Sequence, residues 1–266
     1  LKGGYEIVAL SAGMALAAVE AVAKGELDNA YSLSRPPGHH CLPDNPNGFC
    51  LFNNIAVAVE AALAKGLVNR VAVLDWDVHH GNGTEAIYYD RDDVLTISLH
   101  QENNYPPKSG AIDARGQGAG LGHNINVPLF AGSGHTAYMH AMERIVTPAL
   151  DAFKPDMIIV ACGFDAALFD PLASMLATVK TFKDMTAHIM ADAQRLCAGK
   201  LVLTHEGGYS EAYVPFCGHA TIATLAGSQT DAPDPLAEVV ANRQPTAEMD
   251  AFLRGTIDRM ATQLEL

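Results

Sequence analysis

The chain has 266 residues and a formal net charge of -13; 49% of its residues are hydrophobic and only 18% are charged. This length fits one large α/β domain or two small ones, and the composition excludes a disordered chain. The acidic balance argues against binding to the phosphate backbone of nucleic acids, which requires clustered Lys and Arg. It is compatible with cationic substrates.

Five cysteines without a CxxC pair favour reduced thiols in a cytoplasmic protein over a disulfide framework or a thiolate zinc site. No uninterrupted apolar run reaches the ~18 residues of a membrane span. The run IVALSAGMALAAV, bounded by Glu6 and Glu20, predicts a core helix instead. We therefore expect a cytoplasmic protein without a membrane segment or signal peptide, and Leu1 in place of Met indicates a missing N-terminus.

Strand-like runs alternate with apolar runs at helical spacing along the whole chain. We expect strands at 30–34, 71–76, 94–100, 124–129, 157–162 and 201–206, and helices at 5–24, 53–65, 135–153, 179–198 and 211–226. This alternation predicts an α/β fold with helices on both faces of a mainly parallel sheet. A linker-like piece, 227–238, precedes a last amphipathic helix near 246–263. We expect one domain, 1–266, with 227–266 as a C-terminal appendage.

Polar or glycine-rich loops follow most of the expected strands. Their sequences are RPPGHH, DVHHGNG, HQENNYPP, GFDAALFDP and HEGGYS. Ligands of open parallel sheets bind outside the carboxyl ends of the strands. Five such loops at one edge predict a single site.

Ionisable residues crowd the end of the strand in VLDWDVHH, 73–80. Burying such groups is costly unless they are paired or bind a metal. Asp77 and His79 are two residues apart and point to the same side of an extended segment, and Asp165 follows another apolar strand. Two carboxylates and an imidazole with open positions are typical of catalytic zinc sites. For a single Asp, helix or turn capping is the simpler interpretation.

Asp75 should point away from that cation. It is placed to bind a second, hard cation or to orient a histidine from a neighbouring loop. Ser98 and Leu99, at the end of the next strand, are placed to supply a hydroxyl and a carbonyl to the second cation.

The histidine pair and the HEGGYS loop add candidates for proton transfer. His39 and His40 cannot both lie on one face of an extended loop, so they need separate partners. One neutral imidazole can take a proton from water at the metal while the other stabilises the leaving group. Gly207 and Gly208 permit a sharp turn that presents Tyr209, whose hydroxyl can hydrogen-bond an oxyanion. Taken alone, a surface His-His turn and an ordinary Gly-Gly-Tyr turn are the simpler alternatives.

The motifs RPPGHH, GFCLFNNIAVA, LDWDVHHGNGT, ISLH, GFDA and EGGY occur in the order found in histone deacetylases. From about residue 5 to 226 the chain resembles the class II branch and its bacterial histone deacetylase-like amidohydrolases, with acetylpolyamine amidohydrolases nearby. The resemblance implies the three-layer arginase–deacetylase α/β fold, with a central mainly parallel sheet of about eight strands. It also implies one zinc ion per chain, held by Asp77, His79 and Asp165.

The resemblance further assigns roles to the polar residues of the site. His40 would be the general base, oriented through Asn82, and His39 its partner, paired with Asp75. Tyr209 would polarise the acetyl carbonyl together with zinc.

A tunnel for the acyl-lysine chain is implied as well. Phe49 and Tyr105 would form its walls, Gly48 would make room between them, and Gly207 and Gly208 would complete the lining. A structural potassium would be held by Asp75 and Ser98 with the carbonyls of Asp77, His79 and Leu99. A second potassium would lie near Tyr88, Arg91 and Val94.

The function implied is hydrolysis of N-acetyl or short acyl amides of lysine-like amines, without an acyl-enzyme. The substrate would be an acetylated lysine peptide or an acetylated polyamine, hydroxamates would inhibit, and homo-oligomers are common among relatives. Family members carry a further N-terminal segment with the first strand and a substrate-gripping rim loop. A ureohydrolase with two manganese ions is disfavoured because Ala167 stands where a second bridging Asp is needed. A binder of acyl-lysine without turnover is the remaining alternative.

Overall fold

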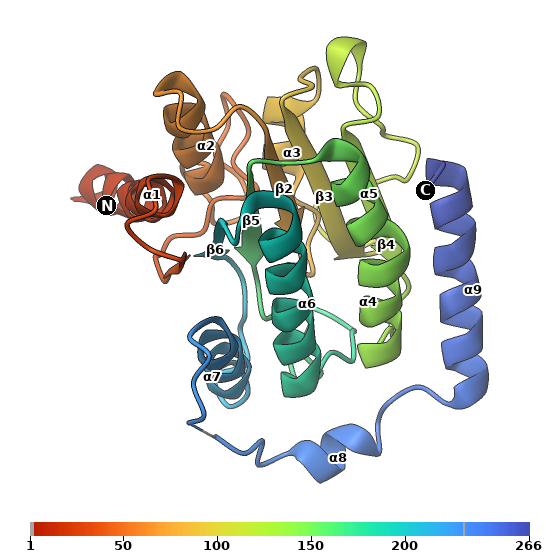
Figure 1. The fold of residues 1–266 in the computed structure, drawn as a ribbon. Helices are drawn as coiled ribbons and strands as arrows, with labels where there is room; N and C mark the ends of the chain where they lie inside the picture. The colour runs from red at the N-terminus through yellow and green to blue at the C-terminus, as the bar shows by residue number, and fades with distance from the viewer. Residues whose placement is uncertain (1–2, 231) are drawn as a thin grey trace.

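The computed structural model describes residues 3–230 and 232–266 (Figure 1). Residues 1–2 and 231, which the expected domain includes, lie outside the described residues. A six-stranded sheet with the order β1-β6-β5-β2-β3-β4 forms the centre, and every neighbouring pair is parallel. The strands are β1 (Asn29–Ser32), β2 (Val71–Asp75), β3 (Val94–Gln101), β4 (Asn124–Leu129), β5 (Met157–Cys162) and β6 (Leu201–His205).

Each of the six apolar runs predicted to be a strand forms one, which confirms the prediction. No predicted strand end differs from the observed end by more than two residues. The sheet within the described residues therefore has six strands, and the number of about eight was wrong. That number came from the resemblance and not from the pattern. The described segments between the six runs form helices or polar loops, so they supply no further strand to this sheet.

Both faces of the sheet are buried, which explains why its strands are continuously apolar. In β2, Val71 and Val73 belong to a core shared with two N-terminal helices, while Ala72 and Leu74 belong to a larger core on the opposite face. Helices therefore form layers on both sides of the sheet (Figure 1). This arrangement confirms the predicted three-layer α/β architecture.

The helices lie close to their predicted positions. They are α1 (Gly4–Ala23), α2 (Asn54–Ala64), α3 (Asn82–Tyr88), α4 (His135–Ala141), α5 (Thr147–Phe153), α6 (Val179–Cys197), α7 (Val214–Leu225), α8 (Ala237–Ala241) and α9 (Ala247–Leu264). Side-chain caps fix several of the starts: Asn53 accepts a hydrogen bond from the backbone of Ala56, and Thr178 accepts one from that of Thr181. The short helices α3 and α8 were not predicted, because five to seven residues carry little periodicity.

The single helix expected over 135–153 is interrupted. A π-helical segment, η2 (Met142–Val146), separates α4 from α5. Pro148 lies in the first turn of α5 and has no N–H to donate to the preceding turn. The periodicity of the apolar residues continues across this interruption, so the pattern alone could not reveal it.

Helix α1 packs on α2 through one face only. Val8, Ala15 and Val22 are buried, whereas Tyr5 and Leu10 are largely exposed. By length and mean hydropathy this 20-residue helix is apolar enough to cross a membrane, although 33% of its apolar window is buried inside the protein. The helix predicted for the core therefore contributes one face to it and leaves the other exposed.

The C-terminal appendage packs against the larger core. Helix α9 buries Leu253, Ile257, Ala261 and Leu264, whose spacing places them on one face. Its Asp258 carboxylate lies 2.9 Å from His140 Nε2 and accepts a hydrogen bond from Arg144 Nε at 3.1 Å. These contacts tie α9 to α4 and η2.

Candidate metal centre and active site

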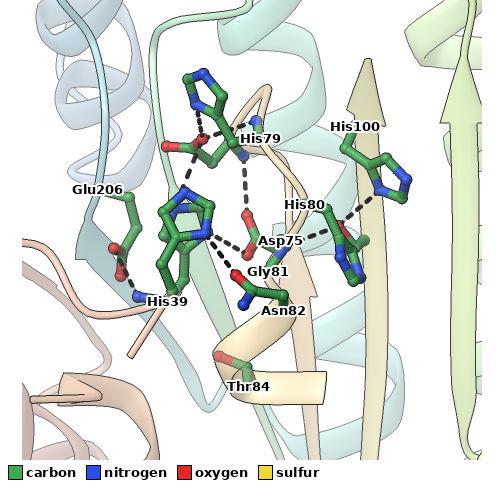
Figure 2. A network of polar contacts seen from close by, with 12 residues as sticks. His39, Asp75, His79, His80, Gly81, Asn82, Thr84, His100 and Glu206 are labelled. Carbon is green, nitrogen blue, oxygen red and sulfur yellow. Dashed lines mark hydrogen bonds and ion pairs between the residues drawn. The ribbon is translucent and has the colours of Figure 1, made fainter. Parts of the chain in front are cut away.

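The candidate site lies at the carboxyl edge of the sheet (Figure 2). Strands β1, β6, β5, β2 and β3 are consecutive neighbours, so the loops that follow them are brought side by side. Four of these loops carry the predicted metal ligands, the histidine pair and Tyr209. The loops therefore meet at one edge of the sheet, as their sequences predicted.

The three predicted metal ligands meet in the interior. His79 Nδ1 lies 3.1 Å from Asp77 Oδ1 and 3.1 Å from Asp165 Oδ2. One donor atom from each residue lies within 4.8 Å of the other two, and all three residues are buried. Donors held about 2.0–2.2 Å from a tetrahedral zinc are roughly 3.3–3.5 Å apart, so this donor set fits such an ion.

The electrostatics of the three ligands favour a cation. Burial raises the pKa of Asp165 to about 7, and the facing Asp77 carboxylate adds to the shift. Burial alone would lower the pKa of His79, but its contacts with Asp165 and Asp77 outweigh this and raise it to about 10. Two carboxylates in a dry interior therefore stabilise positive charge between them.

Backbone groups fix the orientation of both carboxylates. Asp77 Oδ2 accepts a hydrogen bond from the Gly207 N–H at 2.7 Å, and Asp165 Oδ1 accepts one from the Val78 N–H at 2.8 Å. The other oxygen of each group faces His79. A Cβ on Gly163 or Gly207 would come within 3.0 Å of these carboxylates, so only glycine fits there. Sequence reasoning missed the role of Gly163.

The histidine pair is held by two separate partners, as predicted. His39 Nδ1 lies 2.9 Å from Asp75 Oδ2, and His40 Nδ1 lies 2.8 Å from Asn82 Oδ1. The assumption that this loop is extended was wrong, and the two ring centroids are only 3.9 Å apart. The segment turns here, with the Cys41 N–H bonded to the Gly38 carbonyl, and is not extended.

The two histidines differ in their affinity for a proton. Burial and the neighbouring His39 lower the pKa of His40 to about 2. Burial alone would lower the pKa of His39 too, but the carboxylates of Asp75 and Asp77 raise it well above its usual value. The pair thus offers one neutral imidazole beside one that holds a proton.

Two acidic residues without a predicted role support this arrangement. Glu206 is buried and accepts hydrogen bonds from the backbone N–H groups of Gly38 (2.7 Å) and His39 (3.1 Å). Asp170 accepts one from the Tyr209 N–H at 2.7 Å. Both lie in the quoted motifs HEGGYS and GFDAALFDP, but their partners are remote in sequence. A further donor group, His39, Cys50 and Glu206, was not predicted.

Tyr209 and Phe49 lie beside each other near the histidine pair. Their ring centroids are 6.3 Å apart, and Gly208 adopts a φ of 136° that gives the sharp turn before Tyr209. Burial raises the pKa of the Tyr209 hydroxyl, which therefore remains a hydrogen-bond donor at neutral pH. This state suits the polarisation of a carbonyl.

Two of the predicted tunnel residues, Gly48 and Tyr105, contact the His40 ring. Gly48 has a φ of 51° and lies so close to the His40 ring that a Cβ would clash with it. Phe49 is 70% exposed. The Tyr105 ring meets His40 edge-on, with centroids 5.0 Å apart and an interplanar angle of 86°, and its centroid is 6.2 Å from that of His79.

The residues predicted to bind potassium are only partly brought together. The register of β2 and β3 places Asp75 opposite Ser98, next to Leu99. The Ser98 hydroxyl lies 3.0 Å from His100 Nδ1. Tyr88 and Arg91 join α3 to β3 beside Val94, and the Tyr88 carbonyl accepts a hydrogen bond from Arg91. Both potassium sites stay predictions.

This fold and site define a hydrolase of the deacetylase and amidohydrolase class. The chain belongs to the histone deacetylase family, whose domain it matches over residues 1–225. It is 57% identical over 264 residues to a histone deacetylase-like amidohydrolase of Pseudomonas aeruginosa, covering 99% of this chain and 70% of that protein.

Two solved structures share the fold. The crystal structure of the HDA15 HD domain superposes with a TM-score of 0.80 at 35% identity, covering 97% of this chain and 71% of that one. An acetylpolyamine aminohydrolase from Burkholderia pseudomallei gives a TM-score of 0.75 at 38% identity, covering 81% and 61%.

Proposed function

We propose that this chain is a zinc-dependent deacetylase that hydrolyses N-acetyl or short acyl amides of lysine-like amines. The observation that carries the proposal is the buried Asp77–His79–Asp165 donor set beside a neutral imidazole. A bound zinc ion would polarise the amide carbonyl and acidify a water molecule. An acetylated amine as substrate is supported by the similar proteins, which include an acetylpolyamine aminohydrolase.

The chain's own residues would handle the protons. His40, neutral and oriented by Asn82, would accept a proton from the attacking water, and His39 would carry the charge beside Asp75. The Tyr209 hydroxyl would donate a hydrogen bond to the carbonyl oxygen as negative charge develops there. Because no serine or cysteine nucleophile is involved, acetate would leave without an acyl-enzyme.

Other parts of the proposal concern the surroundings of the site. Potassium at Asp75 and Ser98 would stabilise the loop that carries the zinc ligands. Hydroxamates would inhibit by binding the zinc ion. All five cysteines are buried and free, which supports a reducing compartment such as the cytoplasm. Assembly into a homo-oligomer is a further proposal.

The experiment is acetate release by the zinc-loaded 266-residue chain from acetyl-lysine peptides and acetylated polyamines. We expect turnover that a chelator abolishes and zinc restores, and that a hydroxamate inhibits. The preferred substrate in the panel decides between a peptide and a polyamine. Peptide binding without acetate release would instead favour an acyl-lysine binder.

A further inference from the structure

Asn47 connects the two proposed walls of the tunnel. Its Oδ1 atom accepts a hydrogen bond from the Tyr105 hydroxyl and a second one from the backbone N–H of Gly48, at 3.1 Å. An amide oxygen has two lone pairs, so both bonds can form together. The Tyr105 side chain is thereby joined, through Asn47, to the turn that carries Phe49.

The turn itself is rigid. Asn47 and Cys50 exchange two backbone hydrogen bonds, of 3.0 and 2.7 Å. Between them, Gly48 and Phe49 adopt φ values of 51° and 67°, in the left-handed region. Phe49 is therefore held in a conformation that its neighbours must maintain. The position of the Phe49 ring follows from the position of this turn.

The opposite wall is attached to the metal-ligand loop. The Tyr105 carbonyl accepts a hydrogen bond from the His80 N–H at 3.2 Å, and the Tyr105 ring packs against His40 and His79. Its hydroxyl is the only polar atom of that ring and is engaged by Asn47. Among the described residues, this bond is the polar link between the Tyr105 ring and the Phe49 turn.

We propose that the Asn47–Tyr105 hydrogen bond is a latch that fixes the separation of the tunnel walls and selects substrates with an unbranched methylene chain. Asn47 is a positioning residue in this role. When a tunnel wall is already ordered before binding, substrate binding does not have to supply the free energy of ordering it. The tunnel then has a fixed width, and it favours a substrate chain that fits this width. The inference rests on the proposed function, since it takes the passage beside Tyr209 as the substrate tunnel.

Three hydroxamates test the latch on the zinc-loaded chain: a straight-chain alkyl hydroxamate, its branched isomer, and acetohydroxamate, which has no chain to enter the tunnel. Tyr105→Phe should weaken straight-chain binding roughly three- to tenfold, as expected for one lost hydrogen bond, and Asn47→Leu, which also loses the bond from the Gly48 N–H, should weaken it at least as much. Acetohydroxamate binding should change less than about twofold, and the preference for the straight isomer should fall.

Matched variants separate the latch from a general structural effect. Asn47→Asp keeps an acceptor oxygen and should bind like the parent chain. Tyr31→Phe removes another tyrosine hydroxyl that is bonded to a side chain, His205, and makes no contact with Asn47 or Tyr105, so it should also bind like the parent. The Tyr105→Phe/Asn47→Leu double variant should bind no more weakly than Asn47→Leu alone, because that variant has already lost the bond to Tyr105.

Three results would overturn the latch: unchanged straight-chain binding in both single variants, equal weakening of acetohydroxamate, or losses that add in the double variant. A double-mutant cycle of unfolding in metal-free protein tests the same bond without ligand, and zero coupling between the two positions would also reject it. If the parent chain binds hydroxamates but releases no acetate, the proposed function fails while the latch stands.

Discussion

The backbone of Gly207 lies directly against the Asp165 carboxylate, where a Cβ would come within 3.0 Å of Oδ2. The same residue donates its N–H to Asp77, so it contacts both acidic ligands. A methyl group at this position must displace one of them. The geometry of the candidate metal centre therefore depends on a residue that carries no donor side chain.

Gly207→Ala should accordingly abolish zinc retention in a chain that still folds. The measurement is the zinc content per chain after dialysis, with circular dichroism to confirm the fold. Gly13→Ala is the matched control, because Gly13 lies in α1 with no atom near the added methyl group. Because Gly13 lies in a helix interior, Gly13→Ala should raise the free energy of unfolding by about 0.5–1 kcal/mol. Normal zinc content in Gly207→Ala would contradict the geometry described above.

Asp165→Asn should lose zinc for an electrostatic reason. The substitution keeps the shape of the side chain but removes one of the two charges that hold the cation. We expect zinc per chain to fall from near one to near zero, as measured by atomic absorption. Asp258→Asn on α9 removes a hydrogen-bonded carboxylate far from the site and should retain zinc. Equal losses in both variants would indicate a non-specific effect.

Tyr209→Phe should keep zinc and slow the reaction. If the hydroxyl acts as an oxyanion donor, its loss should cost about 2.7–4 kcal/mol of barrier, or roughly 10²–10³ in kcat. The rate of acetate release in a single turnover, at saturating substrate, measures this change in the activation barrier directly. Near-normal turnover would remove Tyr209 from the proposed mechanism.

His100 should make the protein sensitive to acid. Burial, with the neighbouring His80, lowers the pKa of His100 to about 3, whereas the pKa of a histidine in the unfolded chain is near 6.5. Between these values only the unfolded state binds the proton. The free energy of unfolding should therefore fall as the pH drops from 6.5 toward 3, by up to about 1.4 kcal/mol per pH unit.

His100→Gln should reduce this slope while its amide can still donate to the Gly110 carbonyl, which lies 2.9 Å from His100 Nε2. Denaturant unfolding of both chains at several pH values between 4 and 7 gives the comparison. If the free energy of unfolding depends on pH with the same slope in the parent chain and in the variant, another group controls the acid sensitivity.

Strands and metal ligands were predictable because both follow short-range patterns. The bounds of β4 and β5 match their apolar runs, and two-residue spacing placed Asp77 and His79 together. Glu206 and Asp170 were missed because each binds backbone N–H groups from remote segments, which no local pattern records. The close approach of the His39 and His40 rings was missed because a turn replaces the extended segment.

The buried thiols give the protein an internal reporter of unfolding. None of the five cysteines is more than 7% exposed, and none is paired in a disulfide. An aqueous thiol reagent should therefore label the native chain slowly and all five positions once it is denatured. The labelling rate then measures how often the core opens, without any substrate, metal or optical probe.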